Sequence, residues 1–245
     1  MTVVTVEQRG QITIVSINRP EKLNAINKAA AIELQEAFAE FDRSAQRVAV
    51  LCGAGGRAFS AGADVTDLPE LWRCVPTVGI STDKPIIAAV GGWCIGGGLV
   101  MAMMCDLLVA SETARFSYPE GKVGITGGMI AGLAARIPHK VAMEMMLLGE
   151  PIDAARAYEV GFANRVVAAG GEIDAAVAMA QKIVDLAPLA LAAMKRFVND
   201  GVLPKGPVEL MARYGAELGA VRDSEDAKEG VRAFREKRRP RYRGQ

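Results

Sequence analysis

The stretch GGWCIGGGLVMAMMCD, Gly91 to Asp106, lies in the most apolar part of the chain and contains five glycines. No charged residue occurs between Lys84 and Asp106, a span of 21 residues, and that length is sufficient for a membrane-spanning helix. However, the glycines separate a β-rich run, PIIAAVGG, from a helix-like run, LVMAMMCD. The pattern therefore predicts a buried strand followed by a helix, with no membrane span.

The glycines Gly96 to Gly98 are expected at this strand-to-helix junction. Glycine lets the backbone approach a ligand closely, and the first N–H groups of a helix have no partner within the helix. Such a junction can bind an anion or stabilise an oxygen that becomes negative during a reaction. From these residues alone, a tight turn beneath a buried helix is an equally good interpretation. The pattern differs from a dinucleotide-binding fingerprint and from a P-loop.

A second turn rich in small residues, RAFSAGADV (Arg57 to Val65), follows the apolar run RVAVLC. Two such turns after two neighbouring strands can direct two backbone N–H groups at one oxygen. That arrangement suits a thioester carbonyl that passes to an enolate. The second turn therefore favours the functional interpretation of the first.

The first two thirds of the chain mixes strand and helix patterns. Alternating residues in Val3–Val6 and Gln11–Ile17 predict a β-hairpin. Helical spacing predicts a helix over Asn27–Phe41, and apolar runs predict strands at Arg47–Cys52 and Ile86–Val90. Strands that alternate with helices indicate an α/β fold with parallel pairing.

From Asp153 onward the pattern becomes helical, with Asp153 as an expected N-cap and Gly161 as the residue that ends a short helix. The further helices are predicted at Glu172–Leu186, Pro188–Asn199, Val208–Val221 and from Ser224 onward. We therefore predict an α/β core over residues 1–168, with the ligand site, and a helical region over residues 169–245.

Composition excludes several classes of protein. The 245 residues are 51% apolar and 23% charged, and 29 basic residues stand against 28 acidic ones, for a net charge of +1. This balance indicates a globular protein and argues against a nucleic-acid-binding role. The four cysteines form no C-x-x-C pair, and the N-terminus lacks a signal-peptide pattern, so we expect free thiols and a cytoplasmic location.

The C-terminal sequence VRAFREKRRPRYRGQ is strongly basic. Its positive charges are Arg232, Arg235, Lys237, Arg238, Arg239, Arg241 and Arg243. A solvated tail and a phosphate-binding patch are both consistent with this composition.

Six motifs in order along the chain resemble those of the enoyl-CoA hydratase/isomerase, or crotonase, superfamily. They are NRPEKLNAI (18–26), RAFSAGADV (57–65), KPIIAAVGGWCIGGG (84–98), AMMCDLLVAS (102–111), ARFSYPEGKVGI (114–125) and the terminal AFREKRRPRYRG. Each motif is short, but their ordered occurrence over nearly the whole chain is specific.

The resemblance implies a spiral of ββα units with a C-terminal trimerisation region, in a homotrimer or a hexamer built as a dimer of trimers. It implies an acyl-CoA substrate, with no metal and no cofactor other than the coenzyme A of the substrate. The backbone N–H groups of Ala63 and Gly97 would form the oxyanion hole. The residues matched to CoA contacts are Lys22, Leu23, Asn24, Ala25, Ala61, Gly62, Asp64, Val65, Phe234 and Lys237.

One departure from the family pattern concerns the acid–base groups. Hydratases of this family hold a water between two glutamates, and the first of these positions is Val100 in this chain. The second is present as Glu120, in SYPEG. Hydration needs a base and an acid, whereas moving a double bond needs one base that takes a proton from C2 and returns it to C4. The sequence therefore favours an enoyl-CoA isomerase.

Three alternatives remain at this point. A hydratase could hold its water with a different group, and a hydroxycinnamoyl-CoA hydratase-lyase also lacks the first glutamate and shares the GWC motif found at Gly92–Cys94. A non-catalytic acyl-CoA-binding protein is the third, although Glu120 argues against it. His139, the single histidine, is expected to be structural.

Overall fold

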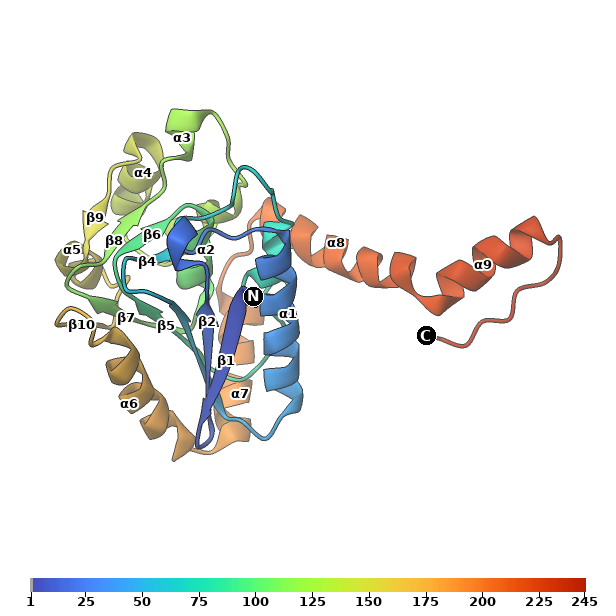
Figure 1. The fold of residues 1–245 in the computed structure, drawn as a ribbon, viewed down its shortest axis with the longest axis horizontal. Helices are drawn as coiled ribbons and strands as arrows, with labels where there is room; N and C mark the ends of the chain where they lie inside the picture. Colours follow the sequence, from blue (N-terminus) through green and yellow to red (C-terminus); the bar gives the residue numbers. More distant parts are fainter. Residues whose placement is uncertain (1) are drawn as a thin grey trace.

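Two β-sheets form the centre of the body of the molecule, and helices surround them (Figure 1). The computed structural model describes residues 2–245. The larger sheet has six strands in the order β1 (Val4–Arg9), β2 (Ile12–Ile17), β3 (Val48–Gly53), β5 (Ile86–Val90), β7 (Leu107–Ser111) and β10 (Arg165–Val167). The smaller sheet has four strands in the order β4 (Ala58–Ser60), β6 (Trp93–Ile95), β8 (Arg115–Ser117) and β9 (Ile152–Asp153).

From β3 to β8, successive strands alternate between the two sheets. The pairs β3 and β4, β5 and β6, and β7 and β8 each contribute one strand to each sheet, and α2 (Gly97–Met104) and α3 (Glu120–Val123) follow the second and third pairs. Strands β2, β3, β5, β7 and β10 are parallel, whereas β1 and β2 form the predicted antiparallel hairpin. The predicted α/β spiral of ββα units is thus confirmed.

Helices cover both faces of the larger sheet. On one face, α1 (Lys28–Arg43) buries Leu34, Phe38 and Phe41 in the main hydrophobic core, and its N-cap Asn27 accepts the Ala30 N–H at 3.0 Å. On the other face, α6 (Glu172–Val184) packs its apolar side against β3, β5 and β7. Because parallel strands are covered on both faces, they consist of continuous apolar runs.

The remaining helices lie around this body or extend from it. They are η1 (Pro20–Lys22), η2 (Leu71–Cys74), η3 (Met129–Ala135), α4 (His139–Leu148), α5 (Ala154–Glu159), α7 (Pro188–Phe197), η4 (Val198–Val202), α8 (Pro207–Asp223) and α9 (Glu225–Arg235). Asp153 caps α5 by accepting the Arg156 N–H at 2.8 Å, as predicted. Among residues 2–245, none of the helices alone has the length and apolar composition of a membrane span, and the bent pair 172–184 and 188–202 has both when its two helices are taken together.

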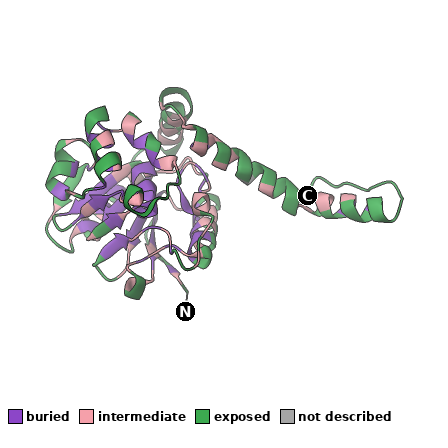
Figure 2. Cartoon of the chain, turned by 90° about the horizontal axis from the view of Figure 1, so that it is seen from above, coloured by how far each residue is buried: buried purple, intermediate pink, exposed green. Residues whose placement is uncertain are grey.

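The C-terminal helices α8 and α9 form an arm that extends away from the body (Figure 1). Figure 2 shows that the body contains nearly all of the buried residues, whereas most of the arm is exposed. The change from strands to helices occurs near residue 168, but α6 packs on the sheet. The spatial separation therefore comes later, within α8, whose first turns still contact the body through Ala212 and Arg213.

Candidate active site

A cavity of about 330 Å³ lies where the two predicted turns meet the segment that carries Glu120. Its wall contains the predicted residues Ala61, Gly62, Ala63, Val65, Gly97 and Glu120. The other lining residues are Leu68, Leu71, Ile95, Gly96, Val100, Tyr118, Pro119, Val123, Ile125, Thr126, Gly127 and Met129. The fold thus brings together residues that are as far apart in sequence as Ala61 and Met129.

The first turn is held by hydrogen bonds that leave one N–H unused. Ser60 Oγ donates to the Asn24 carbonyl at 2.8 Å and accepts the Gly62 N–H at 3.1 Å. The Asp64 N–H donates to the Ile26 carbonyl at 2.8 Å. Among the described residues, none accepts a hydrogen bond from the N–H of Ala63, which lies between them. This N–H is available to a ligand.

The second turn begins α2 and touches the first. Gly96 has φ +55°, a left-handed conformation that favours glycine, and Gly97 is the first residue of the helix. A Cβ atom placed on Gly62 would lie 3.1 Å from the backbone nitrogen of Gly97. The predicted oxyanion donors therefore belong to two turns in direct contact, at the helix end where partial positive charge favours an anionic oxygen.

Glu120 lies against this junction. It is the first residue of α3, and its Oε1 is so near Gly96 that a side chain at position 96 would overlap it. Its Oε2 is buried and has no hydrogen-bond partner within the described part of the chain. Burial disfavours the charged carboxylate and raises the pKa of Glu120 to about 7. Such a group can accept and release protons near neutral pH.

The other side chains of the cavity are mostly apolar. Val100, at the position of the missing glutamate, is 3% exposed and lines the same space from α2. Glu120 is the one charged side chain in this wall, as far as the described residues go. The wall also contains the hydroxyl groups of Tyr118 and Thr126. Tyr118 Oη and Thr126 Oγ1 form a hydrogen bond of 3.0 Å.

The two segments predicted to contact CoA in the body lie side by side. The Ala61 N–H donates to the Leu23 carbonyl at 2.9 Å, and Lys22 is exposed beside them. The Asn24 side chain is buried and donates to the carbonyls of Ala54 and Ala58, at 2.9 and 2.7 Å. Asn24 therefore shapes this loop through its side chain. The contact of these segments with CoA stays a prediction.

Arg19 joins the same two segments and was not among the predicted site residues. Its Nη1 donates to the Ala25 carbonyl at 2.6 Å and to Asp64 Oδ2 at 3.0 Å. Hydrogen bonds from Thr66, followed by that from Arg19, lower the pKa of Asp64 to about 2. Arg19 lies within the NRPEKLNAI motif, but nothing local in the sequence indicates a partner 45 residues away.

Leu71 is a second residue that the sequence did not single out. A Cβ atom on Gly97 would lie 2.7 Å from Leu71 Cδ2, so this side chain packs directly on the first residue of α2. Leu71 starts the short helix η2 in the segment between Asp64 and Lys84. It can therefore limit the space beside the expected position of the thioester.

The remaining predicted residues lie elsewhere. Phe234 lies in α9, on the arm that extends from the body (Figure 1), and Lys237 follows this helix. Neither residue lines the cavity, and Phe234 is 85% exposed. His139 is the exposed first residue of α4 and is absent from the cavity wall. Within residues 2–245, no group of three or more His, Cys, Asp or Glu side chains could hold a metal ion.

Comparison with known proteins gives consistent matches over the whole chain. Residues 7–245 match the model of a family described as enoyl-CoA hydratase/isomerase. The chain is 38% identical to an (E)-benzylidenesuccinyl-CoA hydratase of Thauera aromatica, over 98% of this chain and 99% of that protein. It is 34% identical to a short-chain-enoyl-CoA hydratase of Clostridium acetobutylicum, over 96% of this chain and 95% of that protein. A crystal structure of a carnitinyl-CoA hydratase from Mycobacterium avium superimposes with a TM-score of 0.79, 35% identity and complete coverage of both chains.

Proposed function

The chain belongs to the enoyl-CoA hydratase/isomerase family, and from this premise we propose that it moves the double bond of an enoyl-CoA thioester. The observation that carries this proposal is that Glu120 is the single carboxylate among the described residues of the cavity wall, which also contains the apolar Val100. One carboxylate is sufficient for a reaction in which a proton leaves one carbon and returns to another.

In the proposed reaction, Glu120 removes a proton from C2 of a 3-enoyl-CoA and later delivers it to C4. The electron pair of the C2–H bond forms the enolate, whose oxygen accepts hydrogen bonds from the N–H groups of Ala63 and Gly97. The conjugated 2-enoyl-CoA is the product, with no net gain or loss of atoms. The pKa of about 7 and the unpaired Oε2 support Glu120 in this role.

The composition of the cavity wall also favours an uncharged acyl group over a charged one. Its side chains around Glu120 are mostly apolar, and no lysine, arginine or aspartate belongs to the described wall. An acyl group with its own carboxylate, such as benzylidenesuccinyl, would find no cation there, and burying an unpaired charge is costly. We propose that the acyl chain is uncharged and apolar.

The exposed side chains of the arm are suited to contacts with a neighbouring subunit. They include the apolar Met211, Leu218 and Val221, and α9 at the end of the arm extends away from the body of its own chain (Figure 1). We propose that the protein forms a homotrimer or a dimer of trimers in which Phe234 and Lys237 contact the CoA bound to a neighbouring subunit. The free cysteines support a cytoplasmic location.

A panel of acyl-CoA thioesters tests this function. We expect 3-enoyl-CoA to be converted to 2-enoyl-CoA, with rising absorbance of the conjugated thioester and no 3-hydroxyacyl-CoA in the product mixture. Rapid formation of 3-hydroxyacyl-CoA from 2-enoyl-CoA would show a hydratase, and cleavage of a hydroxycinnamoyl-CoA analogue would show a lyase. Tight binding of all these thioesters without turnover would indicate a binding protein.

Hydration is the second candidate, because similar proteins are named hydratases or dehydratases. The hydroxyl pair of Tyr118 and Thr126 is the polar group of the cavity that could replace the missing glutamate in holding a water. If hydration is found, Tyr118→Phe should lower its kcat by about tenfold or more while isomerisation is retained. Thr126→Val, which preserves the tyrosine hydroxyl, should have the smaller effect. Equal rates in the unmodified protein and Tyr118→Phe would exclude this pair.

The pH dependence of the reaction follows from the pKa of the base. Glu120 must be ionised to accept a proton from C2, and burial raises its pKa to about 7. We therefore expect kcat/KM to rise as the pH passes through about 7 and to level off above it. A series of initial rates with one 3-enoyl-CoA measures this. A profile that is flat between about pH 5.5 and about pH 8.5 would assign the proton transfer to another group.

A further inference from the structure

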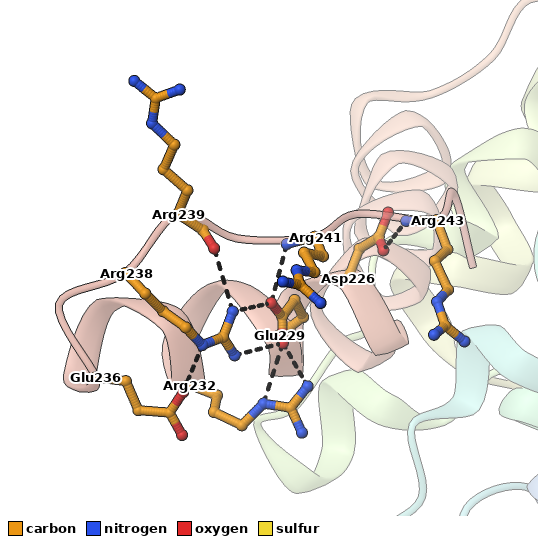
Figure 3. Close-up of polar contacts among 8 residues, drawn as sticks. All are labelled: Asp226, Glu229, Arg232, Glu236, Arg238, Arg239, Arg241 and Arg243. Carbon is orange, nitrogen blue, oxygen red and sulfur yellow. Dashed lines mark hydrogen bonds and ion pairs between the residues drawn. The ribbon is translucent and has the colours of Figure 1, made fainter.

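The last ten residues of the chain fold back along α9 and are fixed to it by two carboxylates (Figure 3). Asp226, in the first turn of α9, accepts the backbone N–H groups of Arg243 and Gly244, each at 2.7 Å. The Asp226 N–H in turn donates to the carbonyl of Gln245 at 3.0 Å. The end of the tail is therefore held at the start of the helix.

Glu229 is the centre of the second attachment. Its side chain is 8% exposed, although it lies on the arm, because the tail covers it. Arg238 donates two hydrogen bonds to it, from Nη1 to Oε1 at 2.6 Å and from Nη2 to Oε2 at 3.0 Å. Arg232 Nε donates to Oε2 at 3.0 Å and the Arg241 N–H to Oε1 at 2.9 Å. We call these contacts of Glu229 the tail clasp.

The tail clasp holds an unfavourable backbone turn. Lys237 has φ +54°, in the left-handed region where glycine is preferred. The Arg238 N–H donates to the Ala233 carbonyl at 3.1 Å, the hydrogen bond that closes a helix end of the Schellman type. The side chain of Arg238, the next residue, is the one bound by Glu229. Non-glycine residues remain in such conformations where surrounding contacts fix them.

The tail clasp also divides the basic residues into two groups. Arg232 and Arg238 are paired with Glu229, and Arg238 also pairs with Glu236, so two carboxylates compensate these two charges. Lys237 and Phe234 are exposed, and no salt bridge in the described residues uses the lysine. A phosphate ligand would thus meet Lys237, together with arginines that are unpaired in the described chain, such as Arg235 and Arg239, as free cations, whereas Arg238 is already paired.

We propose that Glu229 is a positioning residue for CoA binding: the tail clasp fixes Lys237 in its left-handed turn, so that Lys237 and Phe234 are ordered before the nucleotide end of CoA arrives. This inference rests on the proposed function, in which these two residues contact CoA. Ordering a contact in advance lowers the entropic cost of binding. Glu229 acts through the turn and does not itself touch the ligand.

The test compares Glu229→Gln with Glu225→Gln in the full-length protein. Glu225 lies on the same helix and forms an exposed pair with Lys228, so its variant loses the same charge without touching the tail clasp. For Glu229→Gln we expect KM for an enoyl-CoA to rise about three- to tenfold. We expect kcat and the KM of the matching pantetheine thioester, which lacks the nucleotide, to be unchanged. Trypsin should also cleave the tail faster after Arg241 and Arg243. Glu225→Gln should change none of these values.

A third variant separates this inference from the proposed function. Lys237→Ala removes the proposed contact itself, and if it leaves the KM for the enoyl-CoA unchanged, the contact between the tail and CoA is wrong. If Lys237→Ala raises that KM and Glu229→Gln does not, the contact stands and the positioning role of Glu229 is wrong. If Glu229→Gln does not fold, Arg238→Ala takes its place, because it removes the arginine that binds Glu229 in the tail clasp. The same KM and proteolysis measurements then test the positioning role.

Discussion

Glu120→Gln lowers kcat for double-bond isomerisation by at least about 100-fold, while the binding of CoA thioesters is preserved. Glutamine keeps the size of the side chain but cannot accept a proton from C2. The carboxylate that it replaces is the one charged group in the described wall of the cavity. Steady-state rates together with a binding isotherm for a saturated acyl-CoA measure the two effects separately. Turnover at the unmodified rate would remove Glu120 from the mechanism.

The thermal stability of Glu120→Gln provides a control for its folding. Burial raises the pKa of Glu120 from an ordinary value of 4.5 to about 7. Its protonated form therefore contributes stability that is present below the unfolded pKa and is lost as the pH rises through about 7. Above pH 7 the unmodified protein contains a buried, unpaired carboxylate, so Glu120→Gln should be the more stable of the two. A higher Tm for the variant at pH 8 than for the unmodified protein would show that lost activity is not lost structure.

Gly97→Pro lowers kcat by about 100- to 1,000-fold, because proline removes the N–H that is proposed to stabilise the enolate oxygen. Proline is well tolerated at the first position of a helix, which is the place of Gly97 in α2. The obstacle is Leu71, whose side chain packs on this residue. The comparison should therefore be made in a Leu71→Ala background, where a larger residue has space.

In that background, Gly97→Ala is the matched control, since alanine adds a Cβ atom but preserves the N–H. We expect Gly97→Ala to retain most of the activity of Leu71→Ala and Gly97→Pro to lose it. Circular dichroism and Tm values should agree between the two variants. The same kcat in both would place the oxyanion donor elsewhere.

The parts of the fold with local causes could be predicted from the sequence. The strand β5 was predicted at its observed bounds, Ile86–Val90. Ser224 caps α9 by accepting the Ala227 N–H at 3.0 Å, in agreement with the predicted start of that helix. Strands β4, β6 and β8 have three residues each and are too short for an alternating pattern to be recognised. Their pairing in a second sheet depends on contacts between distant segments.

The site was partly predictable for the same reason. The two turns and Glu120 are visible as motifs, but the contact between Gly62 and Gly97, and the position of Leu71 over α2, arise only when the sheets form. Arg19 and Asp64 form an ion pair across 45 residues. The separation of the arm was also not predictable, since an apolar helical stripe does not reveal whether it packs on its own chain or on another.

The three glycines at the start of α2 are adjacent in sequence but have three different neighbours. Glu120 blocks a side chain at Gly96, and the flexible side chain of Leu71 blocks one at Gly97. At Gly98 the obstacles are Cβ and the backbone oxygen of Ser60, each 2.8 Å from the place of a Cβ atom. During evolution, a second substitution could therefore compensate for a larger residue at one of these three glycines, Gly97. A smaller residue at position 71 can accommodate a change at 97, whereas a change at 96 displaces the base and a change at 98 displaces strand β4.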